Sequence, residues 1–150
     1  MSNQKNWLNT IQTQIQKFRS IHPKDIKRYK IDQLERIAKR VEQFSQQCSQ
    51  CSMQKQEITK LAHNLEFIKG STQTRKEYHK KLRLLINHLQ KKHKLVAEGQ
   101  YIGIGIAIGV ALGVPFMTVL GGAGIALGIP FGLVFGIAME NKAKKEGKII

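Results

Sequence analysis

Acidic residues are scarce in this sequence, and one long stretch contains no charged residue of either sign. The 150 residues include 10 Asp and Glu against 25 Lys and Arg, which gives a formal net charge of +15 at pH 7. Residues 1–100 hold 21 Lys and Arg and eight Asp and Glu, whereas residues 101–139 hold none. The chain therefore divides into an apolar region and a basic region that needs an anionic partner, either phospholipid headgroups or nucleic acid.

An apolar export signal is missing from the first residues, which read MSNQKNWLNTIQTQIQKF. We therefore expect the basic region to stay in the cytoplasm, where thiols remain reduced. Only two cysteines are present, Cys48 and Cys51, in a single C-x-x-C. A zinc site needs four ligands, and the nearest downstream candidate, His63, leaves the set incomplete. We therefore expect no metal and no other cofactor, and we interpret both cysteines as small core residues.

Apolar residues recur at intervals of three and four along the basic region, which predicts helices. The expected helices cover about residues 3–21, 25–69 and 74–98, and together they form a cytoplasmic domain. The second helix carries a coiled-coil seam with one lysine in it, and the short connection after Gly70 predicts that the second and third helices form an antiparallel pair. The seam residues are Leu34, Ile37, Val41, Phe44, Cys48, Cys51, Lys55, Ile58, Ala62 and Leu65.

The uncharged stretch from Tyr101 to Met139 has 39 residues. A single membrane span needs roughly 20 apolar residues, so the stretch predicts two spans in a transmembrane hairpin over residues 99–140, followed by a basic tail over residues 141–150. Lysines on both flanks place both termini in the cytoplasm of a bacterium, with the hairpin in the inner membrane. The predicted fold class is all-α. The expected contacts to anionic lipid or nucleic acid are Lys91, Lys92, Lys94, Lys142, Lys144 and Lys145.

Glycines recur every four residues within the apolar stretch, and the segment from Gly109 to Phe116 is repeated from Gly124 to Phe131. Such spacing leaves one helix face without side chains, so that another helix can approach to backbone contact. The hairpin can use these faces for its own packing or for assembly into an oligomer, and we expect a homo-oligomer. The glycines concerned are Gly105, Gly109, Gly113, Gly124, Gly128, Gly132 and Gly136.

The segment from Gly99 to Met139 resembles the glycine-zipper segments of small bacterial membrane proteins. That resemblance implies close-packed membrane helices, which are often oligomeric, and it carries no particular activity.

One catalytic-looking motif is present, because Arg83 and His88 have the R-x-x-x-x-H spacing of HEPN-type ribonucleases. In those all-helical enzymes the histidine acts as acid and base without a metal. The polar residue that usually follows the arginine is replaced by Leu84. The chain also has a looser resemblance to accessory membrane proteins of type VI CRISPR systems, which combine a membrane segment with a divergent motif of this kind. We favour the alternative, in which Arg83 is a surface base and the chain is not an enzyme.

These observations predict an oligomeric inner-membrane protein that forms a pore or perturbs the membrane, with the basic helical domain as its control element. A toxin or an antiviral defence effector is the expected role. Two alternatives remain open: a membrane-tethered module that binds nucleic acid or a protein, and a HEPN-like ribonuclease that uses Arg83 and His88.

Overall fold

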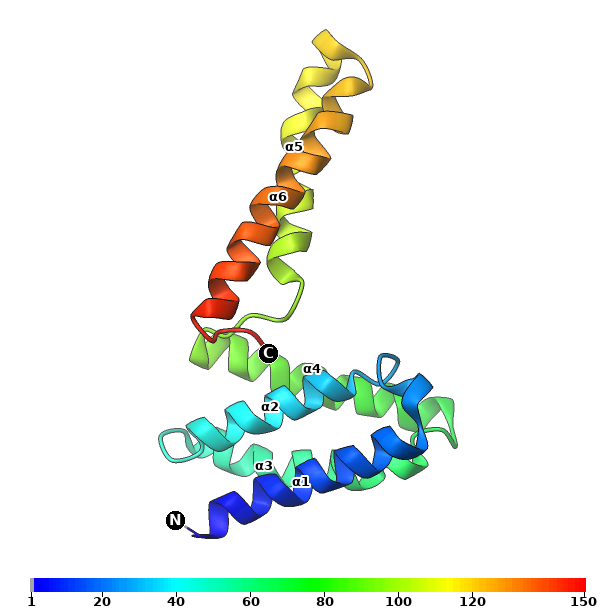
Figure 1. The fold of residues 1–150 in the computed structure, drawn as a ribbon, viewed down its shortest axis with the longest axis vertical. Helices are drawn as coiled ribbons and strands as arrows, with labels where there is room; N and C mark the ends of the chain where they lie inside the picture. The colour runs from blue at the N-terminus through cyan, green and yellow to red at the C-terminus, as the bar shows by residue number, and fades with distance from the viewer. Residues whose placement is uncertain (1) are drawn as a thin grey trace. The chain divides into compact units, whose positions relative to one another are not determined.

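A computed structural model describes residues 2–150, apart from the side chains of residues 2–5, 119 and 120. The regular secondary structure of the described residues is helical, apart from one isolated β-bridge between Val96 and Ile149, which confirms the all-α fold class. It divides into two compact units, residues 1–93 together with Ile150, and residues 94–149. Figure 1 shows the helices in chain order.

Four α-helices form the first unit, and Figure 1 shows that each one runs roughly antiparallel to the helix before it. The predicted antiparallel pair therefore corresponds to α3 and α4, the helices on either side of Gly70. Two short 3-10 helices, η1 (Pro23–Asp25) and η2 (Asn64–Phe67), lie in the connections. The helices are α1 (Ser2–Ile21), α2 (Ile31–Phe44), α3 (Ser49–His63) and α4 (Thr72–His93).

The apolar positions that recur at intervals of three and four form the core of this unit. Burying each large aliphatic side chain contributes about 1.5–3 kcal/mol, so this shared core holds the four helices together. Eight of the ten seam residues of the sequence pattern are buried, and Phe44 and Lys55 are half-buried. They pack into a core between four helices instead of a two-stranded coiled coil. The most deeply buried aliphatic residues are Ile11, Ile15, Ile31, Leu34, Ile37, Ile58, Leu65, Leu82 and Leu89.

The helix boundaries differ from the predicted ones at four places. The predicted helix over residues 25–69 is divided, because Lys30 takes a left-handed conformation (φ 51°) and Cys48 an extended one (φ −135°, ψ 108°). The helix predicted to reach residue 98 ends at His93, where Lys94 is also left-handed (φ 56°). The last helix continues past residue 140 to Lys145. The spacing of apolar residues persists across each turn, so periodicity alone does not reveal these breaks.

The second unit is a helical hairpin of α5 (Gln100–Leu120) and α6 (Ala123–Lys145). The chain turns at Gly121, whose φ of 59° is a conformation that favours glycine. Both helices are long and apolar enough to cross a membrane, each with a mean hydropathy of 1.8. The unit is therefore compatible with a membrane location.

Candidate functional site

The glycines of α5 and α6 face one another across the hairpin. A Cβ atom built on Gly113 would lie 2.8 Å from the carbonyl oxygen of Gly124, and one on Gly109 would overlap the carbonyl oxygen of Gly128. Gly105 meets the backbone of α6 in the same way, at Gly132. Only residues without side chains permit this approach. The hairpin therefore uses the glycine faces for its own packing, and any assembly of hairpins needs another surface.

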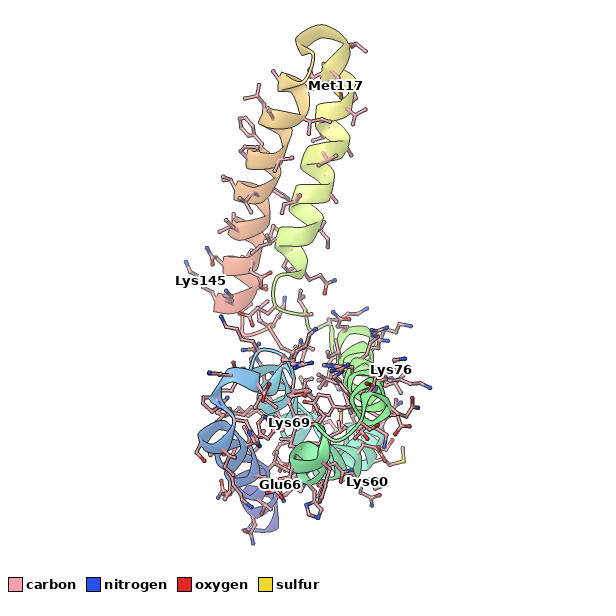
Figure 2. The ribbon with its side chains drawn as sticks, turned by 90° about the vertical axis from the view of Figure 1, so that its right-hand side faces the viewer. Lys60, Glu66, Lys69, Lys76, Met117 and Lys145 are labelled. Atoms are coloured by element: carbon pink, nitrogen blue, oxygen red, sulfur yellow. The ribbon has the colours of Figure 1, made fainter. Side chains whose placement is uncertain are left out.

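The outer surface of the hairpin is apolar and exposed. Only 17% and 22% of the most apolar windows of α5 and α6 are buried within the structure, whereas the core helix of a soluble protein is mostly buried. Figure 2 shows carbon-only side chains along most of the hairpin between Met117 and the lysines near Lys145. Large side chains exposed on this surface include Leu112, Val114, Phe116, Leu127, Phe131, Val134 and Phe135.

A buried carboxylate lies at the base of the hairpin. Glu140 is only 2% exposed, and its Oε1 accepts a hydrogen bond of 2.8 Å from the backbone N–H of Gly99. Gly99 is the N-cap of α5, so the carboxylate satisfies one free donor of that helix and offsets the positive end of its dipole. The sequence alone does not reveal this contact, because Gly99 and Glu140 are 41 residues apart.

A basic groove of about 380 Å³ runs along α4 in the first unit. Among the described residues, Lys76, Lys80 and Arg83 form no ion pair, and the neighbouring acid Glu77 accepts a hydrogen bond from Gln73 instead. Figure 2 shows Lys76 among nitrogen-tipped side chains on α4. We call this surface the α4 groove; its lining residues are Arg75, Lys76, His79, Lys80, Arg83 and Leu84.

His79 forms the aromatic wall of the α4 groove. Its ring stacks on Tyr29 at a centroid distance of 6.4 Å and an interplanar angle of 21°, and the guanidinium of Arg28 lies 5.8 Å from the Tyr29 ring centre. Partial burial lowers the pKa of His79, and the nearby charges of Lys30, Arg75 and Arg83 lower it further. The lowered pKa therefore reflects burial of the ring first and the positive charges around it second.

The two residues of the R-x-x-x-x-H motif belong to different clusters. Arg83 is exposed and lines the α4 groove. The imidazole of His88 lies 3.2 Å from the sulfur of Cys51, measured from Nε2 to Sγ. In one copy of the chain these two side chains therefore do not converge on a common substrate position. The six flanking lysines of the sequence analysis are all exposed, Lys91, Lys92, Lys94, Lys142, Lys144 and Lys145.

Two cysteines and two histidines converge in the first unit. Cys48 and Cys51 come from the start of α3, and His88 and His93 from the last two turns of α4. The four ligand atoms all lie within 4.8 Å of one another. The sequence pattern singled out the two cysteines, with His63 as the nearest possible third ligand. His63 is exposed and is not one of the four residues of this cluster. The spacing of the two histidines, with four residues between them, was the available signal, because zinc ligands often occur as H-x₃₋₅-H.

The protonation of this cluster depends on its surroundings. Backbone amides of Cys51 and Gln50 lower the pKa of the Cys48 thiol, whereas burial and the nearby Cys48 raise the pKa of the Cys51 thiol to about 12. Burial, followed by the charge of Lys92 and the nearness of the two rings, lowers the pKa of His88 and of His93. Both imidazoles are therefore neutral near pH 7, which leaves each with one nitrogen lone pair for a ligand.

Comparisons of the chain with protein-family models, with curated proteins and with solved structures found no match.

Proposed function

We propose that the chain is a membrane-tethered module that binds nucleic acid. The hairpin of α5 and α6 anchors it in a bilayer, and the α4 groove holds the phosphate backbone of the nucleic acid. The observation that carries the proposal is the set of cations in this groove, which lack acidic partners among the described residues and lie beside a stacked aromatic pair.

Hydrophobic burial supports the anchor. Burying one large apolar side chain contributes about 1.5–3 kcal/mol, and α5 and α6 expose more than ten such side chains. The backbone of each helix satisfies its own hydrogen bonds, as a span in lipid requires. Lysines before α5 and at the end of α6 favour a hairpin with both ends on the cytoplasmic side of a bacterial inner membrane.

Charge and geometry support nucleic acid as the occupant of the groove. The residues Arg75, His79 and Arg83 occur at intervals of four along α4. Their side chains therefore form one row along the helix, with about 6 Å between successive members. Phosphates recur along a nucleic-acid strand at a comparable spacing, and guanidinium groups bind them with two hydrogen bonds. The half-buried ring of His79 lies among these cations, and aromatic rings next to cations are typical of surfaces on which bases stack.

A titration of the full chain in detergent with a fluorescent oligonucleotide tests the proposal. Replacing two groove lysines (Lys76→Gln with Lys80→Gln) should weaken binding by about tenfold or more and reduce the salt dependence by about 2 in the log–log slope, because roughly 0.9 counterions are released per phosphate contact. The matched control removes Lys39 and Lys60, which pair with Glu35 and Glu57.

The control variant has the same net charge as the groove variant and should bind like the parent. Equal weakening by both variants would show a response to net charge alone and would contradict a groove. If the parent binds no oligonucleotide even at about 50 mM salt, the proposal is overturned, and anionic lipid headgroups become the partner of the groove.

A second candidate function is an oligomer that perturbs the membrane. One side of the hairpin seam remains open as an apolar groove of about 580 Å³, with walls that include Leu127, Phe131 and Phe135. A ridge of side chains from a second hairpin would fill this groove.

In bacteria that express the chain, a voltage-sensitive dye should then report depolarisation, and the double variant Phe131→Ala with Phe135→Ala should abolish the depolarisation. Val134→Ala is the control, because Val134 is equally exposed but does not line this groove. An unchanged potential with the parent well inserted would contradict a constitutive pore.

A further inference from the structure

We infer that Cys48, Cys51, His88 and His93 bind a single Zn²⁺ ion in a structural site of the first unit. The inference is independent of the proposed function, because it concerns neither the hairpin nor the α4 groove.

The distances between the four side chains match those of a tetrahedral site. Zinc bonds of about 2.3 Å to sulfur and 2.0–2.1 Å to nitrogen put a sulfur and a nitrogen ligand about 3.6 Å apart. The Nε2 atom of His88 lies 3.6 Å from Sγ of Cys48 and 3.2 Å from Sγ of Cys51. The Nε2 atom of His93 also lies 3.2 Å from Sγ of Cys51. Small movements of the side chains therefore suffice to close four bonds around one ion.

Hydrogen bonds alone do not explain why the four side chains of this cluster lie so close together. Two imidazole nitrogens lie equally close to Sγ of Cys51, and a thiol has a single S–H with which to donate to one of them. An ion at the centre gives each of the four atoms the same partner. Two thiolates and two imidazoles in a tetrahedral arrangement are a donor set that selects Zn²⁺ over cations that prefer oxygen.

Neighbouring groups position the ligands before an ion arrives. The ring of His93 stacks on Phe44 at a centroid distance of 4.0 Å and an angle of 16°. The backbone N–H of Cys48 donates a 2.9 Å hydrogen bond to the carbonyl of Phe44, so the same residue holds one cysteine and one histidine. Cys48 and Cys51 are buried, which keeps competing water away from the sulfur ligands.

Four protein ligands complete the coordination of zinc, so the site has no open position for a substrate or a reactive water. The two thiol protons leave when the ion binds, and two thiolates with two neutral imidazoles balance its charge. The ion joins the turn between α2 and α3 to the C-terminal end of α4, and its ligands Cys51 and His93 are 42 residues apart in the sequence. Its role is therefore to fasten α4 to the rest of the four-helix unit.

Metal analysis of the full chain, purified in detergent under reducing conditions, tests the inference. We expect one zinc per chain. Replacement by Co²⁺ should produce the sulfur-to-cobalt charge-transfer band and the intense visible bands of a tetrahedral site. Cys51→Ser and His93→Ala should lose the metal, and removing zinc with a chelator should lower Tm by more than about 10 °C.

Two further variants keep the test decisive if those proteins fail to fold. His93→Cys retains four ligands, so it should keep one zinc and shift the cobalt spectrum towards three sulfurs. His63→Ala removes a histidine that lies outside the cluster, and it should leave zinc content and Tm unchanged. A parent protein that takes up neither zinc nor cobalt, or one isolated with a Cys48–Cys51 disulfide, would overturn the inference. Loss of zinc in His63→Ala would overturn this choice of ligands.

Discussion

Charged residues inside the four-helix unit are held in place by specific partners. Lys55 interrupts the apolar seam, where an unpaired charge would need contact with water. Its ammonium group instead lies 2.7 Å from a carboxylate oxygen of Glu42 and 5.1 Å from the ring centre of Trp7. Both charged side chains are mostly buried, with exposed fractions of 19% and 15%. The lysine therefore joins α2 to α3 and packs under the aromatic residue of α1.

Removing Glu42, the acidic partner of Lys55, leaves the partly buried lysine charge unpaired. We expect Glu42→Ala to lower the free energy of unfolding by about 2 kcal/mol, since breaking a fully buried pair costs about 3–5 and this pair retains some contact with water. Chemical denaturation of the full chain measures the change. Glu57→Ala breaks exposed pairs with Lys60 and Lys81 and should cost less than about 1 kcal/mol. Equal losses of unfolding free energy in Glu42→Ala and Glu57→Ala would contradict the larger contribution of the buried pair.

His79 makes the α4 groove sensitive to pH. Its pKa is lowered in the folded chain, so below the ordinary value of about 6.5 the unfolded chain takes up a proton first. The contribution of His79 to stability is therefore complete above about pH 6.5 and is lost as the pH falls through its lowered pKa. A bound phosphate backbone stabilises the protonated ring, so binding should raise this pKa.

A proton NMR titration of the His79 ring, with and without an oligonucleotide, measures both effects. We expect a midpoint below 6.5 for the free chain and a higher one for the complex. The ring of His63, which is exposed and lies outside the groove, serves as the internal control, and its chemical shifts at a fixed pH should be the same with and without the oligonucleotide. A midpoint of His79 that does not respond to the oligonucleotide would place the nucleic acid elsewhere.

At the scale of helices, the glycine faces determine how α5 and α6 pack. A methyl group on Gly109 would overlap the backbone of α6, whereas one on Gly103 meets nothing within 4 Å. We expect Gly109→Ala to cost about 1–3 kcal/mol of helix packing, because the backbone must move apart, and to speed amide exchange in both helices. Gly103→Ala should slow amide exchange or leave it unchanged, because alanine stabilises a helix by up to about 1 kcal/mol relative to glycine.

Hydrogen-exchange mass spectrometry of the full chain in detergent separates the two variants by peptide. If Gly103→Ala loosens the hairpin as much as Gly109→Ala does, the glycines act only through helix propensity, and the packing shown by the structure is wrong.

Local patterns predicted most of the helices, and the missed features depend on contacts between distant residues. The absence of charge from residue 101 to residue 139 and the paired glycines were sufficient to predict the hairpin. The turn at Cys48 was not predictable, because Phe44, Cys48 and Cys51 continue the helical spacing through it. The cysteine–histidine cluster requires the start of α3 to meet the end of α4. The predicted antiparallel pair brings these segments together, and the spacing of His88 and His93 is typical of zinc ligands, but the exact register that aligns the four side chains depends on the turn at Cys48. The α4 groove was visible as a row of basic residues spaced by four, although the flanking lysines were the predicted contacts.

For the whole molecule, the separation of charge from apolar surface is the property that the proposed function uses. Nearly all of the excess positive charge lies before residue 101, and most of the large exposed apolar side chains lie on α5 and α6. An electrostatic anchor weakens as salt screens it, whereas burial of apolar surface does not. A change in salt concentration therefore distinguishes the proposed hairpin anchor from electrostatic attachment to a membrane, and it should weaken the proposed binding of nucleic acid in the α4 groove.

Flotation of the full chain with vesicles of uncharged phosphatidylcholine tests the central claim most directly, with a labelled oligonucleotide present at low and at high salt. The account predicts that the chain floats with the vesicles at both salt concentrations and carries the oligonucleotide only at the lower one. A chain that stays behind at high salt would contradict the hairpin anchor. A chain that floats but carries no oligonucleotide at low salt would contradict the binding of nucleic acid.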